Sequence, residues 1–161
     1  MKELHMPKCY QLVGVPAAGK STWYKNQTWM SECTYISTDR IIERYARSRG
    51  QTYTQVFSLL MPRAVDVMTQ QVKRAKEHNR DIVWDQTSTT ISSRRRKFNL
   101  LPNYEHIAVV FATPESSVLT QRLNTRPGKT IPTEVVAQMI RDLQLEPPTQ
   151  AEGFTEIWYA A

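Results

Sequence analysis

Short apolar runs alternate with longer amphipathic stretches along the chain. Runs short enough to be buried strands lie at 9–13, 34–37, 81–84 and 107–112, and a further run at 155–159 is expected at the edge of a sheet. The stretches between them favour helices at 20–28, 39–48, 54–78, 92–100, 115–124 and 133–144. This alternation is typical of an α/β protein in which a central parallel sheet carries helices on both faces.

The longest predicted helix, 54–78, has a clear apolar stripe formed by Val65, Met68, Val72 and Ala75. Pro62 is expected to kink this helix or to begin its main segment, because proline cannot donate the backbone hydrogen bond of a helix interior.

The length of 161 residues predicts a single domain that spans the whole chain, 1–161, and has no second catalytic module. Lys and Arg outnumber Asp and Glu by 21 to 15, for a net charge of +6. This excess favours a polyanionic partner such as nucleic acid, although a basic surface can also serve solubility alone.

The two cysteines, Cys9 and Cys33, have no C-x-x-C spacing, which predicts reduced thiols and no zinc site. Residues 1–5 lack the apolar core of a signal peptide, and no apolar stretch approaches the length of a membrane span. We therefore expect a cytoplasmic protein with no membrane partner.

Residues 14–21 read Gly-Val-Pro-Ala-Ala-Gly-Lys-Ser, a complete G-x-x-x-x-G-K-[ST] phosphate loop between a predicted strand and a predicted helix. Its backbone N–H groups can surround a triphosphate, Lys20 can reach the outer phosphates, and the Ser21 hydroxyl can bind Mg²⁺. ATP and Mg²⁺ are thus the expected cofactors. The predicted nucleotide-binding residues are Gly14, Val15, Pro16, Ala17, Ala18, Gly19, Lys20, Ser21 and Thr22. Alanine at position 18 is tolerable unless the backbone there needs a positive φ.

Polar residues follow two other strands, and ligands of such sheets bind at the carboxyl ends of the strands. Asp39 could accept a proton from an attacking hydroxyl, or it could cap the helix 39–48. Asp85 could organise the magnesium shell or orient an arginine that binds the acceptor, and Thr87 could hydrogen-bond a substrate. A polar turn that caps the helix 92–100 is the alternative for this segment.

Arg122 and Arg126 lie four residues apart before a Pro-Gly break, a pattern typical of a lid that stabilises a transferring phosphoryl group. They could equally be solvated cations at a helix end. Arg40, Arg44 and Arg47 recur on one helical face beside Asp39 and could bind a nucleic-acid backbone, as could the basic run 94–97. A solvated face is the alternative for both clusters.

Together these motifs resemble the kinase domain of the 5′-polynucleotide kinases of phage and animals. The resemblance rests on the phosphate loop, Asp39, Asp85-x-Thr87 with a trailing Arg94-Arg95 pair, and Arg122-x-x-x-Arg126 followed by Gly-Lys-Thr-Ile-Pro at 128–132. The segment 145–154, Leu-Glu-Pro-Pro-Thr-Gln-Ala-Glu-Gly-Phe, looks like the terminal motif of the animal enzymes' kinase domain.

This resemblance implies a P-loop kinase with an arginine-bearing lid that phosphorylates the 5′-hydroxyl of DNA or RNA. It implies that Lys20 and Ser21 bind the donor phosphates and metal, and that Asp39 is the general base. Asp85 and Thr87 would support the acceptor, and Arg126, assisted by Arg122, would stabilise the transferring group.

The chain departs from the phage pattern at Thr38 and Ile42, where the phage enzymes have arginines, so Arg40 or Arg44 would bind the acceptor instead. Similar kinases that act on hydroxymethyluracil bases in DNA, or on nucleosides and other small molecules, remain alternatives. A nucleotide-sensing binding module would need neither the base nor the lid arginine.

Overall fold

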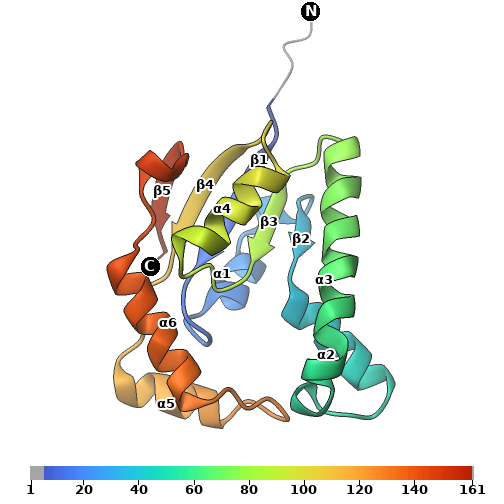
Figure 1. Ribbon diagram of the computed structural model, residues 1–161, viewed down its shortest axis with the longest axis vertical. Helices are drawn as coiled ribbons and strands as arrows, with labels where there is room; N and C mark the ends of the chain where they lie inside the picture. Colours follow the sequence, from blue (N-terminus) through green and yellow to red (C-terminus); the bar gives the residue numbers. More distant parts are fainter. Residues whose placement is uncertain (1–5, 161) are drawn as a thin grey trace, which may run out of the picture.

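The computed structural model describes residues 6–160, so the expectation drawn from residues 1–5 lies outside the described part of the chain. Five strands form one parallel sheet in the order β2-β3-β1-β4-β5. The strands are β1 (Lys8–Val13), β2 (Thr34–Ile36), β3 (Ile82–Asp85), β4 (Glu105–Val110) and β5 (Glu156–Tyr159). Every predicted strand is present, so the predicted α/β fold with a central parallel sheet is confirmed (Figure 1).

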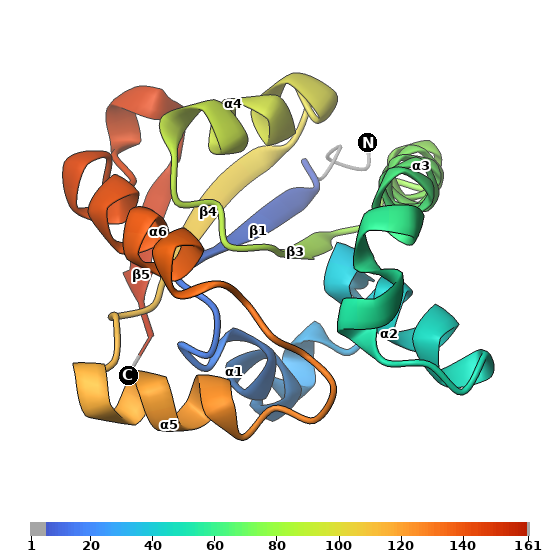
Figure 2. The same ribbon diagram turned by 60° about the horizontal axis from the view of Figure 1, so that its bottom comes forward.

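Helices cover both faces of this sheet, as parallel connections require. They are α1 (Lys20–Asn26), α2 (Thr38–Ser48), α3 (Tyr53–Glu77), α4 (Ile91–Leu100), α5 (Ser116–Asn124) and α6 (Thr133–Leu145). Short 3₁₀ turns lie at Thr28–Met30 and Gln150–Glu152. Figure 2 shows α4 on one side of the sheet and α1 and α5 on the other.

Two apolar clusters hold these layers together. Neighbouring residues of β1 point to opposite faces, so Cys9 belongs to the cluster that α3 covers and Tyr10 to the cluster that α1 covers. Met68, Val72 and Ala75 of the predicted stripe are buried, whereas Val65 is exposed. Both cysteines are free thiols.

Pro62 lies inside α3 and does not begin it. The helix begins earlier because Thr52 and Gln55 form a capping box, in which the side chain of each accepts a hydrogen bond from the backbone of the other. This start places Tyr53 and Thr54 at the carboxyl edge of the sheet, where they contact the candidate site described below.

Two of the four residues in the basic run 94–97, Arg94 and Lys97, are buried. At these two positions the run therefore forms neither a solvated face nor a nucleic-acid contact. Arg94 is fully buried and donates to Glu152 Oε1 at 2.8 Å, to the carbonyl of Ser88 at 2.9 Å and to that of Glu146 at 2.7 Å. Lys97 is also buried, with its ammonium group 5.4 Å from the ring centre of Trp84. Arg94 thus fastens the C-terminal segment to the loop that follows β3.

We predict that Glu152→Gln lowers the free energy of unfolding by about 3 kcal/mol, because it leaves the Arg94 charge buried without its anionic partner. Urea denaturation measures this change, and Arg95→Met is the matched control because Arg95 is exposed on the same helix. Equal, small effects of the two substitutions would show that the buried pair contributes nothing to stability.

Candidate active site

The phosphate loop joins the end of β1 to the start of α1 and is held in a turned conformation. Gly14 donates its N–H to the carbonyl of Thr87 at 3.0 Å, which fixes the loop to the segment after β3. Gly19 has a φ of 99° and Ala17 a φ of 65°, in the left-handed region that favours glycine. The sequence predicted backbone strain at Ala18 if any alanine were strained, but the strain falls on Ala17, because the path of the loop places the positive φ there.

Lys20 is folded over this loop. Its ammonium group donates to the carbonyls of Gly14 and Val15, each at 2.9 Å, and its side chain is buried. Burial lowers the pKa of Lys20 to about 8, although the negative charges of Asp85 and Asp39 oppose this shift. The lysine is therefore a buried cation whose contacts are backbone carbonyls, and an incoming phosphate would offer it a far stronger partner.

Ser21 and Asp85 meet across the pairing of β1 with β3. The Ser21 hydroxyl donates to Asp85 Oδ2 at 2.9 Å, and the Tyr35 hydroxyl donates to the same oxygen. Burial and the negative charge of Asp85 raise the pKa of Tyr35, so the phenol stays neutral and remains a donor. Of the two roles that the sequence left open for Asp85, this contact favours the metal side.

The Ser21 and Asp85 oxygens fit Mg²⁺, a hard cation that protein sites commonly hold through one or two oxygen side chains together with substrate phosphates and water. Among residues 6–160, no group of three or more His, Cys, Asp or Glu side chains could hold a metal ion.

Asp39 lies in the first turn of α2 and does not cap it. The cap is Ser37, whose hydroxyl oxygen accepts from the N–H of Arg40 at 3.2 Å. The Asp39 side chain is 52% exposed; its Oδ1 accepts from the Tyr53 hydroxyl at 2.6 Å and its Oδ2 from Lys129 Nζ at 2.9 Å. Asp39 was predicted from the sequence, but neither of these partners was.

The electrostatic surroundings keep Asp39 ionised. Desolvation favours the neutral acid, but the charge of Lys129, the hydrogen bonds from Tyr53 and Lys129, and the charge of Arg126 outweigh it and lower the pKa of Asp39. At neutral pH the group is thus a carboxylate that can still accept hydrogen bonds, since its two oxygens offer about four lone-pair directions.

The two lid arginines stand at the entrance of the same site. We call residues 125–132, between α5 and α6, the lid loop; Figure 2 shows that it reaches from α5 toward α2. Arg122 donates to the carbonyl of Ala17 at 3.0 Å, so it contacts the phosphate loop directly. Arg126 has a buried Nη1 without a hydrogen-bond partner, an arrangement that costs free energy until an acceptor such as a phosphate oxygen arrives.

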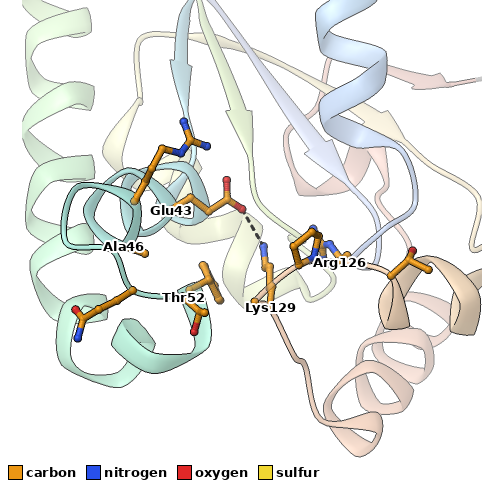
Figure 3. A pocket seen from close by; sticks show the side chains of 11 residues that line it. Glu43, Ala46, Thr52, Arg126 and Lys129 are labelled. Atoms are coloured by element: carbon orange, nitrogen blue, oxygen red, sulfur yellow. Dashed lines mark hydrogen bonds and ion pairs between the residues drawn. The ribbon is translucent and has the colours of Figure 1, made fainter.

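Most of these groups line one cleft of about 1170 Å³. Its lining includes the predicted residues Lys20, Ser21, Asp39, Arg40, Arg44, Arg47, Asp85, Thr87, Arg122 and Arg126. A second pocket of about 630 Å³ opens between α2 and the lid loop and shares Glu43, Arg47, Arg126 and Lys129 with the first (Figure 3). The structure therefore brings the side chains predicted for the donor, the base, the acceptor contact and the lid to one place, whereas the predicted basic run 94–97 does not line this cleft.

Comparison with solved structures identifies the class of fold. A chain of the Pnkp1/Rnl/Hen1 RNA repair complex superimposes with a TM-score of 0.68 at 19% identity, covering 89% of this chain. This chain spans only 46% of that one. A protein of Chloroflexus aurantiacus gives a TM-score of 0.67 at 15% identity, covering 98% of this chain and 86% of its own. Shikimate kinase from Bacteroides thetaiotaomicron gives a TM-score of 0.53 at 17% identity, and the match covers 97% of this chain and 88% of the shikimate kinase.

These likenesses show a P-loop kinase fold, as the sequence predicted. Residues 10–146 match the AAA domain family AAA_33, and the chain belongs to this family. Across the described residues, none of the helices combines the length and the apolar character needed to span a bilayer.

We predict that Ala17→Gly raises the free energy of unfolding by about 1 kcal/mol in the absence of nucleotide. Glycine removes the cost of a left-handed conformation, about 1–2 kcal/mol, against a smaller loss of chain entropy. Ala18→Gly is the matched control and should destabilise, because φ at residue 18 is not positive. Urea denaturation of both variants measures the difference, and the opposite ranking would contradict the strain at Ala17.

The lowered pKa of Lys20 predicts a pH-dependent affinity for ATP. Below its pKa the lysine is charged and binds phosphate, so the Kd should be flat near pH 7 and rise above about pH 8, by up to about tenfold per pH unit. Lys20→Arg keeps its charge throughout this range and should show a flat Kd. Calorimetric titration from about pH 7 to pH 9.5 measures both curves; parallel curves would exclude Lys20 as the titrating group.

Proposed function

We propose that this protein is an ATP-dependent kinase that transfers the γ-phosphoryl group to a hydroxyl group of a nucleic acid, with a 5′-hydroxyl end as the acceptor. The observation that carries this proposal is the row Arg40, Arg44 and Arg47 on α2, which lines the same cleft as Lys20 and Asp39. The likeness of the fold to a chain of an RNA repair complex supports the same acceptor class.

On the donor side, the backbone N–H groups of residues 14–22 would hold the phosphates of ATP. Lys20 would release its two carbonyl partners and bind the outer phosphates. Ser21 and Asp85 would hold Mg²⁺, which when bound neutralises charge on the β- and γ-phosphates. Arg122 already contacts the phosphate loop at Ala17, so it would close the donor site from the lid side.

On the acceptor side, Asp39 would accept the proton of the attacking hydroxyl. The hydroxyl oxygen bonds to the γ-phosphorus while the bond from that phosphorus to the β,γ-bridging oxygen breaks, and ADP leaves. Charge builds up on three oxygens in this loose transition state, and the unpartnered Nη1 of Arg126 is suited to receive one of them. Thr87, which lines the cleft beside Asp85, is available to hydrogen-bond the acceptor.

The arginine row favours a polyanionic acceptor over a small neutral one. Residues 40, 44 and 47 lie on one face of α2, and a helix rises about 1.5 Å per residue, so the row extends about 10 Å along the cleft from Asp39. A free sugar or nucleoside would occupy only the part beside Asp39 and leave the outer arginines without a partner. A nucleic-acid strand would place a phosphate near each of them.

Labelled ATP identifies the acceptor directly. We expect label in 5′-hydroxyl oligonucleotides and little in nucleosides or shikimate. Asp39→Asn should lower kcat by about 10²–10⁴-fold with unchanged ATP affinity, and the helix stays capped because Ser37 is the cap. Label only in hydroxymethyluracil DNA would identify a base kinase, and label only in small molecules would refute a nucleic-acid acceptor.

The arginine row also predicts a salt dependence. Each neutralised phosphate of a single strand contributes about 0.7 to the slope of log affinity against log salt, so Arg44→Ala/Arg47→Ala should flatten the slope by about 1.4. The oligonucleotide KM should rise more than kcat falls, since these contacts bind ground and transition states alike. Arg95→Ala/Arg96→Ala, on exposed positions of α4, is the matched control. An unchanged slope in the first variant would exclude the row as the strand's path.

A further inference from the structure

Lys129 has a set of contacts that the proposed function does not use. The side chain is 6% exposed, and its ammonium group pairs with Asp39 Oδ2 at 2.9 Å and with Glu43 Oε1 at 3.5 Å. The same ammonium lies 4.3 Å from the ring centre of Tyr53, whose hydroxyl holds the other oxygen of Asp39. Figure 3 shows Lys129 pointing from the lid loop toward Glu43 on α2.

The backbone on either side of Lys129 is fastened to the start of α3. Thr54 donates its N–H to the carbonyl of Gly128 at 3.1 Å, and the N–H of Thr130 donates to Thr54 Oγ1 at 2.8 Å. Gly128 has a φ of 67°, and a Cβ there would lie 2.9 Å from Thr52 Cβ. Only glycine allows this close approach, so the lid loop is docked in one place, and Lys129 is docked with it.

We propose that Lys129 is a positioning residue that aligns the Asp39 carboxylate and couples it to the lid loop. The loop carries two cations three residues apart: Arg126, whose buried Nη1 has no partner and would receive a phosphate oxygen in the proposed reaction, and Lys129, which pairs with Asp39. Docking of this one loop would therefore position both the cation for the transferred phosphate and the carboxylate for the acceptor hydroxyl. This inference rests on the proposed function, because it takes Asp39 as the base.

Glu43 is the second anionic partner of Lys129. When Asp39 accepts the hydroxyl proton it becomes neutral, and Lys129 would lose its closest anionic partner in a buried position. Glu43 lies within 3.5 Å of the same ammonium and keeps that charge paired. The ionisable groups that face Asp39 from the surrounding elements are Lys20, Glu43, Tyr53, Arg126 and Lys129.

The test is the pH profile of kcat/KM for whichever acceptor the protein phosphorylates. Lys129→Met keeps the apolar stem but removes the charge, so the acid limb should move upward by at least one pH unit, which costs about tenfold in rate on that limb. Lys129→Met/Glu43→Gln should move the limb back down, because the uncompensated carboxylate of Glu43 no longer disfavours ionisation of Asp39. Lys76→Met, an exposed lysine on α3, is the control and should keep the wild-type profile.

Gly128→Ala is a second variant that leaves Lys129 in place but forces the loop away from Thr52. It should reproduce the upward shift of the acid limb, so it also replaces Lys129→Met if that protein does not fold. A wild-type profile in both variants overturns the proposal, as does an equal loss of kcat at every pH with no rescue by Glu43→Gln. An active wild type that Asp39→Asn leaves unchanged would instead refute the role of the base in the proposed function.

Discussion

Parallel pairing of β1 with β3 on one side and β4 on the other is the constraint on which the candidate site depends. This pairing brings the phosphate loop beside Asp85, so that Ser21 can donate to that carboxylate, and it lets Gly14 bind the carbonyl of Thr87. Side chains that are far apart along the chain therefore meet at one edge of the sheet. The side chains proposed to bind metal and phosphate are thus positioned by buried strands.

The opposite wall of the cleft is built differently. Asp39 is held by Tyr53 from α3 and by Lys129 from the lid loop, and both partners are ordered by local contacts of the α3 start. The buried pair of Arg94 with Glu152 fixes the loop after β3 from the other side. In the proposed reaction most catalysis would be positioning and charge stabilisation, which suits side chains held by buried strands on one wall of the cleft and by a docked loop on the other.

Much of this could be predicted from the sequence. Strands and helices follow from local hydrophobic periodicity, and Asp39, Asp85 and Thr87 could be found because strand ends of a parallel sheet share one edge. The missing parts depend on contacts between distant segments. Nothing in the spacing shows that Lys129 reaches Asp39, 90 positions away, or that Arg94 is buried by Glu152, 58 positions away. The phosphate-loop motif predicts a turned loop but not which of its alanines has the positive φ, and the structure places it at Ala17.

Whether donor and nucleic-acid acceptor meet at Asp39 in one cleft can be observed directly. The measurement is a crystal structure with Mg²⁺, a non-hydrolysable ATP analogue and a short 5′-hydroxyl oligonucleotide. We expect the terminal 5′-oxygen within hydrogen-bonding distance of the Asp39 carboxylate, backbone phosphates along Arg40, Arg44 and Arg47, and the γ-phosphate on Arg126. An oligonucleotide bound away from Asp39, with the nucleotide in place, would contradict it.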